Sequence, residues 1–201
     1  MYLSEEGEDD YNLSLSKFES MLKTNKILFF DSEEFEEIIL HYLDIGKANL
    51  AKKALKLALD QHPNSSGLKL VQVEMYIYDE KLDLAEKMLN ELHALEPRNE
   101  EIYIQRATIF SKRNQHEKAI ENLKIALAYT DDKPDVFNLL GMEYLFMDNL
   151  EDAKYNFMKC LEEDYEDQTA LYNVVCCFEF LDQNEDAIVY LEQYIDQNPY
   201  S

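Results

Sequence analysis

Several residue types that characterise other kinds of protein are scarce in this chain. It has no tryptophan and only four glycines and four prolines in 201 residues, which leaves little room for β-sheets or long loops. Positive charge is also scarce: 19 lysines and arginines oppose 42 aspartates and glutamates, which gives a net charge of -23. A field of this sign repels phosphates, so we expect no nucleic-acid partner. We expect no membrane insertion, because no apolar run reaches the roughly 18 residues that a membrane span needs.

Cysteine is rare as well, and its placement bears on the compartment. The three cysteines, Cys160, Cys176 and Cys177, are an odd number without the spacing of a metal site. They fit a reducing, cytoplasmic setting best. The acidic start of the sequence lacks a basic and apolar leader, so we expect no signal peptide in the sequence as given.

What the chain does contain is a strict repeat. Alanines recur every 34 residues, at Ala51, Ala85, Ala119, Ala153 and Ala187. An aromatic residue precedes each alanine by nine positions, at Tyr42, Tyr76, Phe110, Tyr144 and Phe178. One period held over five copies indicates a small structural unit that is repeated and stacked.

The spacing within each unit predicts two antiparallel helices. Large apolar residues four positions after each alanine share a helical face with it, and proline ends this second helix in three units. An inner apolar stripe, which includes the aromatic residue, marks an earlier helix. The predicted units are residues 32–65, 66–99, 100–133, 134–167 and 168–201.

Possible helix starts follow the same period. Between the two helices of the last three units stand Asn114, Asp148 and Asp182, each with a glutamate three residues later. This is the pattern of a capping box, so we expect these residues to begin the second helices. Asp31 with Glu34 predicts the same device before the first unit, and Pro134 suits the first turn of the helix that opens the fourth.

In these features the chain resembles the tetratricopeptide repeat family, whose unit is a helix-turn-helix of 34 residues with a small residue, an aromatic, an alanine and a late proline at these offsets. The resemblance covers residues 32–201. The fourth repeat matches best, through Phe137, Leu140, Gly141, Tyr144, Ala153 and Phe157, and the second departs most, at Lys69 and Gln72. The resemblance implies an all-α, right-handed α-solenoid, which is a binding scaffold with many possible partners.

The two ends of the chain lie outside this pattern or leave it open. Residues 1–31 divide into an acidic tail, roughly 1–9, and an expected helix from about Asp10 to Thr24 that caps the first repeat. At the other end the fifth repeat has no polar closing helix, although terminal repeats normally need one. Either the chain is a fragment of a longer protein, or the exposed end, with Leu191, Tyr194 and Ile195, packs against another copy in a homodimer.

Negative charge is concentrated in the last two repeats. The five repeats carry net charges of -2, -3, 0, -8 and -6, and no lysine or arginine follows Lys159. One interpretation is that these charges form a solvated acidic surface that keeps the protein soluble. The other is attraction of a basic partner.

The resemblance also implies where a partner would bind. In this family the first helix of each repeat lines a concave groove, chiefly through its second, fifth, ninth, twelfth and thirteenth positions. The residues that we expect to bind a partner are Leu70, Glu74, Ile77, Tyr78, Glu101, Ile104, Asp135, Asn138, Met142, Leu145, Phe146, Tyr172, Cys176, Glu179 and Phe180. The groove is most apolar at its carboxyl-terminal end, where an exposed apolar patch would mark a contact surface. Alternatively, a following segment or the curvature of the helices covers it.

These observations favour a protein–protein interaction scaffold that binds a peptide or helix with apolar side chains and basic flanks. The groove positions lack the lysines and arginines with which related repeats clamp carboxylate tails, so an acidic ligand in the groove is not expected. The four histidines occupy different positions of the repeat, and no glycine-rich loop cradles phosphate. We therefore expect no enzyme activity, cofactor or metal. The alternative is a structural solenoid that self-associates or forms an arm of a larger, even enzymatic, protein.

Overall fold

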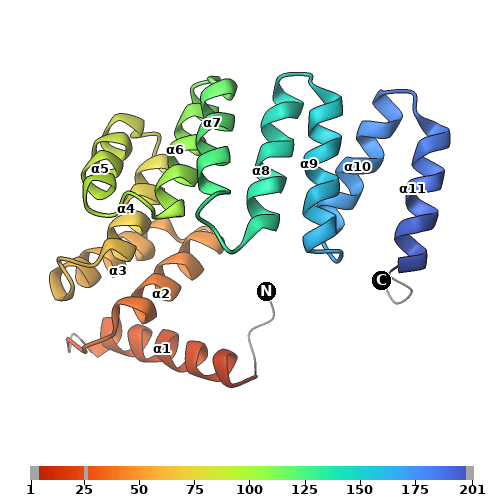
Figure 1. The fold of residues 1–201 in the computed structure, drawn as a ribbon. Coiled ribbons are helices and arrows are strands. Elements are labelled where there is room, and N and C mark those ends of the chain that lie inside the picture. The colour runs from red at the N-terminus through yellow and green to blue at the C-terminus, as the bar shows by residue number, and fades with distance from the viewer. Residues whose placement is uncertain (1–4, 25–26, 198–201) are drawn as a thin grey trace. The chain divides into compact units, whose positions relative to one another are not determined.

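The computed structural model describes residues 5–24 and 27–197, with side chains from Leu13 onward. This part contains eleven α-helices and no strand, so the predicted all-α fold class is confirmed (Figure 1). None of these helices combines the length and the apolar character needed to cross a membrane. In chain order they are α1 (Glu5–Thr24), α2 (Ser32–Asp44), α3 (Ala48–Gln61), α4 (Ser66–Tyr78), α5 (Leu82–Leu95), α6 (Glu100–Lys112), α7 (His116–Ala126), α8 (Lys133–Phe146), α9 (Leu150–Glu163), α10 (Gln168–Phe180) and α11 (Asn184–Gln197).

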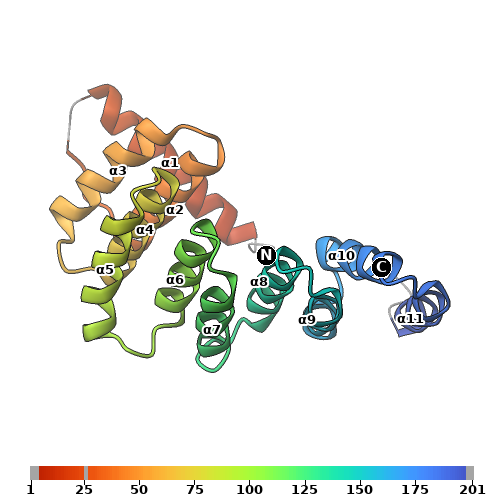
Figure 2. The ribbon, with the colours of Figure 1, turned by 90° about the horizontal axis from the view of Figure 1, so that it is seen from above.

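The helices belong to two compact units, residues 1–92 and 93–201, with the division inside α5. In the first unit α1 packs on α2, and α2 packs on both α3 and α4. In the second unit each helix from α6 to α11 packs on the next along the chain. Figure 2 shows the second unit in two layers, with α6, α8 and α10 in one and α7, α9 and α11 in the other.

The repeated alanines lie where helices cross closely. Ala51, Ala85, Ala119 and Ala153 are fully buried, because a larger side chain would not fit between the packed helices. Ala187, in the last helix, is partly buried. The period that reveals the repeat in the sequence is thus a packing requirement.

The turns between paired helices correct one prediction. Asn114, Asp148 and Asp182 have φ values of 55°, 57° and 57°, and the equivalent Gly46 and Glu80 are also left-handed. In each turn the next amide bonds back to the repeated aromatic residue, as Gln115 N–H does to the Phe110 carbonyl at 2.9 Å. These residues therefore close the first helix rather than begin the second, and the capping-box prediction for them is wrong. Asparagine and aspartate serve both purposes, because their short polar side chains also tolerate left-handed backbone.

The capping prediction at the first repeat is confirmed. Asp31 precedes α2, and its N–H donates to Glu34 Oε2 at 2.8 Å. Pro134 lies in the first turn of α8, as expected.

The helix α1 begins at Glu5, earlier than the expected start near Asp10, and covers the apolar face of α2. Its Phe18 is fully buried, and the ring centroid lies 5.9 Å from that of Phe30, 6.4 Å from that of Phe35 and 6.1 Å from that of Tyr42. Aromatic rings at such separations attract one another beyond the simple burial of area. The helix is thus packed into the core of the first unit.

Candidate partner-binding surface

Nine of the predicted groove residues lie on the neighbouring helices α8 and α10 of the second unit, and six of these nine form its apolar part. Phe146, Tyr172 and Phe180 are 58%, 68% and 73% exposed. Met142, Leu145 and Cys176 are partly buried, and the first two pack against the core around α9 and α10. We call these six residues the α8–α10 patch, defined as Met142, Leu145, Phe146, Tyr172, Cys176 and Phe180.

The position of Phe146 is set by the preceding helix pair. Its ring centroid lies 5.3 Å from that of His116 at the start of α7. His116 Nδ1 in turn lies 2.8 Å from Glu143 Oε2, and Glu143 is buried. A polar pair with one buried and one partly buried member holds both side chains in one geometry, so it also fixes the His116 ring against which Phe146 packs.

The two helices approach each other beside the patch. Asn173 Nδ2 on α10 lies 4.0 Å from Met142 Sδ on α8. Within α10, the side chain of Cys176, one turn further along the helix, raises the pKa of the Tyr172 hydroxyl. Tyr172 therefore presents a neutral, amphipathic ring to a partner.

The other predicted residues of the second unit differ in accessibility. Asp135 and Glu179 are exposed, whereas Glu101, Ile104 and Asn138 are partly buried. Partial desolvation on one side raises the pKa of Asp135, and the neighbouring carboxylates of Asp132, Asp167 and Asp164 raise it further. Each of these effects penalises a negative charge, so a cation beside Asp135 would be favoured.

In the first unit, only some of the predicted groove residues are accessible. Tyr78 and Glu74 are exposed, but Leu70 and Ile77 are buried. The two buried side chains support the packing of α4 and offer little surface to a partner. Position within the repeat does not decide exposure, because α4 is apolar around most of its circumference.

Crowded carboxylates predict a gain of stability on mild acidification. Partial desolvation raises the pKa values of Glu36 and Glu74, although the Glu74 side chain keeps exposed surface, and each has a further acidic neighbour, Glu33 and Asp44 respectively. A carboxyl group with a raised folded-state pKa destabilises the fold once it ionises. We therefore expect the Tm to rise as the pH falls from 7 towards the unfolded-state pKa values near 4.5, the window in which only the folded state keeps these protons.

A pair of variants on neighbouring helices tests this expectation. Glu74→Gln should raise the Tm at pH 7 by about 1–2 °C and weaken its dependence on pH. Glu37→Gln, at an exposed position of α2, serves as the control for the loss of one negative charge. Equal effects of the two substitutions would attribute the gain to net charge alone.

The buried thiols are poor candidates for chemistry. Burial raises the pKa of Cys160 to about 12 and that of Cys177 to about 11. Thiolates are the reactive form of cysteine, and these two groups hold their protons at neutral pH. Across residues 13–24 and 27–197, no three histidine, cysteine or acidic side chains are grouped so that they could hold a metal ion.

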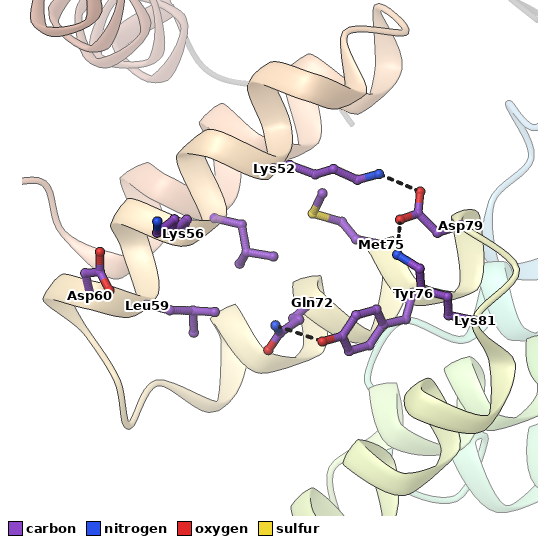
Figure 3. Close-up of a pocket in the computed structure, with 10 residues that line it drawn as sticks. Lys52, Lys56, Leu59, Asp60, Gln72, Met75, Tyr76, Asp79 and Lys81 are labelled. Carbon is purple, nitrogen blue, oxygen red and sulfur yellow. Dashed lines mark hydrogen bonds and ion pairs between the residues drawn. The ribbon is translucent and has the colours of Figure 1, made fainter.

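One concave site was not predicted from the sequence. A cavity of about 410 Å³ lies between α3 and α4, and Figure 3 shows its lysines around apolar side chains. Lys52 and Lys56, one turn apart on α3, were the available signal. The groove positions of the family direct attention to the first helix of each repeat, and α3 is a second helix.

Comparison with known proteins bears on this architecture. Residues 134–167 and residues 169–201 each match a family model described as a tetratricopeptide repeat. No curated protein matches the chain.

Solved structures share the arrangement of helices. The thermophilic TPR protein TTC0263 of Thermus thermophilus has a TM-score of 0.69 at 23% identity, over 84% of this chain and 90% of its own. PilF of Pseudomonas aeruginosa has a TM-score of 0.67 at 21% identity, over 82% and 73%. MamA has a TM-score of 0.61 at 19% identity, over 86% and 97%. At these identities the likeness establishes the fold and nothing about a ligand.

Proposed function

The chain is a tetratricopeptide repeat protein, and on this premise we propose that it is a non-catalytic scaffold that binds a peptide or partner helix on the α8–α10 patch. The fold itself is that of a protein-interaction scaffold in general. The partner that we propose carries apolar side chains for the patch and basic residues beside them. The free cysteines agree with a reducing, cytoplasmic setting for this interaction.

The exposure of Phe146 is the observation that carries the proposal. Its helix, α8, has a helix pair before it and another after it, yet the ring stays 58% exposed. Phe146 is therefore exposed even though other helices precede and follow α8 in the chain. Large aromatic side chains exposed together on adjacent helices are typical of contact surfaces.

Charge supports the basic character of the partner. Repeats four and five carry -8 and -6, and Asp135 and Glu179 stand exposed on the same helices as the patch. Opposite charges around an apolar centre speed association and select against acidic partners. Added salt should therefore weaken binding.

The test is a double substitution, Phe146→Ala with Phe180→Ala. Peptides selected from a random display library against the native chain should combine apolar residues at helical spacing with lysine or arginine. The double variant should bind them at least about tenfold more weakly, because two exposed aromatic anchors are lost, while its Tm changes by less than about 2 °C.

Phe29→Ala provides the matched control, since Phe29 is an exposed phenylalanine of the first unit. It should leave the affinity for the selected peptides unchanged. The proposal fails if the selected peptides bind the double variant as tightly as the native chain. A loss of helix content would instead identify the two rings as core residues.

The apolar side chains of α11 favour a second candidate function, self-association. In α11 no residue is buried, and Ile188, Val189 and Ile195 are exposed. Another copy packed there would cover these side chains. In that case sedimentation would reveal a dimer that grows with concentration and is insensitive to the two phenylalanine substitutions.

A further inference from the structure

The cavity between α3 and α4 has an apolar floor. Leu55 of α3 and Met75 of α4 are buried beneath it, and Leu59 and Tyr76 line it while partly buried. In Figure 3 Leu59, Met75 and Tyr76 lie around the space between the two helices, with Lys52 above them and Lys56 and Lys81 to either side. Its volume of about 410 Å³ falls within the range of about 300–1,000 Å³ that is usual for ligand sites.

Three lysines, Lys52, Lys56 and Lys81, form the rim together with two aspartates, Asp60 and Asp79. Lys52 Nζ lies 2.8 Å from Asp79 Oδ1, and Lys81 Nζ lies 2.9 Å from Asp79 Oδ2. These bonds lower the pKa of Asp79, so its carboxylate stays ionised and holds both lysines in place. Each ammonium has three N–H donors, so both lysines can still bond a ligand.

Lys56 is the lysine of the rim whose positive charge is not paired with an acidic side chain among the described residues. It lies one turn after Lys52 on α3, it is exposed, and its ammonium makes no ion pair or hydrogen bond with any residue in the described part of the chain. An acidic group at the rim would supply the counter-charge that Lys56 lacks.

The rim also stands out against the charge of the whole chain. Of the eleven helices in the described residues, only α3 has more lysines and arginines than aspartates and glutamates: Lys52, Lys53 and Lys56 against Asp60. In a chain with a net charge of -23, an anion is repelled by most of the surface. An acidic ligand that approaches is therefore directed to α3.

We propose that this α3–α4 pocket binds an acidic peptide segment of a partner protein, with one apolar side chain on the floor and carboxylates beside Lys56 and Lys52. The rim is open to solvent, so a segment can enter and leave while one side chain is inserted. Two ammonium groups one turn apart can meet carboxylates on either side of that anchor. This ligand is opposite in charge to the one proposed for the α8–α10 patch, and it uses different helices.

The experiment uses three short fluorescein-labelled peptides and the full chain. The first has phenylalanine between glutamates, the second has glycine in place of the phenylalanine, and the third has lysines in place of the glutamates. Fluorescence anisotropy should show binding of the first peptide, at least about tenfold weaker binding of the second, and no binding of the third.

A matched pair of lysine variants places the site. Lys56→Glu should weaken binding of the first peptide about five- to tenfold, because one attraction becomes a repulsion. Lys53→Glu makes the same charge change on the same helix outside the pocket lining, and it should alter the affinity less than about twofold. The combined substitution of Phe146 and Phe180 should leave this binding unchanged, which separates the pocket from the α8–α10 patch.

Three outcomes would overturn the proposal. The first is no binding of the phenylalanine–glutamate peptide up to about 1 mM. The second is equal binding of the glycine peptide, which would reduce the effect to unspecific charge attraction. The third is an equal loss of affinity in the two lysine variants.

Discussion

Phe18→Ala is expected to lower the free energy of unfolding of the first unit by about 3–5 kcal/mol, because it empties a fully buried aromatic site. The Phe18 ring contacts three other aromatic rings, from Phe30, Phe35 and Tyr42. These three rings lie in α2 and in the segment before it, outside α1. The contacts are therefore lost if α1 separates from α2. Urea unfolding followed by far-ultraviolet circular dichroism measures the loss.

Leu13→Ala is the control for this substitution. Leu13 lies on the same helix but is exposed, so its truncation should change the stability by less than about 0.5 kcal/mol. Amide hydrogen exchange should also show α1 losing protection in the Phe18 variant. If Phe18→Ala cost less than about 1 kcal/mol, α1 would contribute little to the first unit.

Gly141→Ala is expected to destabilise the second unit by about 1–3 kcal/mol, although alanine normally favours a helix over glycine by about 1 kcal/mol. A Cβ at Gly141 would lie only 2.5 Å from Phe157 Cε1 and 2.7 Å from Cδ1 and Cζ. The Phe157 ring is fully buried and has no free space into which to move. Thermal unfolding of the single variant measures the net effect.

A double-mutant cycle identifies the cause. In a Phe157→Leu background the flat ring is gone, so Gly141→Ala should cost much less than it does in the native chain. Gly67→Ala is the matched control, since the atoms that its Cβ would meet are the end of the flexible Glu36 side chain. A cost for Gly141→Ala that is the same with and without the ring would exclude this explanation.

The helix pairs could be predicted from the sequence because their packing is periodic. Four of the five repeated alanines are fully buried, and each marks the same crossing of helices. A small residue that is needed at every such crossing recurs at a fixed spacing, so the crossing can be predicted from the sequence alone. The same logic explains Gly141, a small residue opposite the large Phe157.

The turns show where the pattern was ambiguous. Asn114 lies one residue before the N-cap of α7, and its sequence context suits a cap. A cap and a left-handed helix end differ in backbone dihedral angles, and the same short polar side chains satisfy both. The sequence pattern therefore placed the turn correctly and assigned the wrong role to the residue.

The sequence alone determined the five-fold period, the helical class and the concentration of negative charge near Phe146 and Phe180, since these depend only on the order of residues. The tertiary structure decided which apolar side chains stay accessible, for example that Leu70 is buried while Phe146 is exposed. It also decided that Lys52 and Lys56 of α3 meet Met75 and Tyr76 of α4 around one cavity. Burial and cavities depend on which helices become neighbours, and helix periodicity specifies only which face of each helix is apolar.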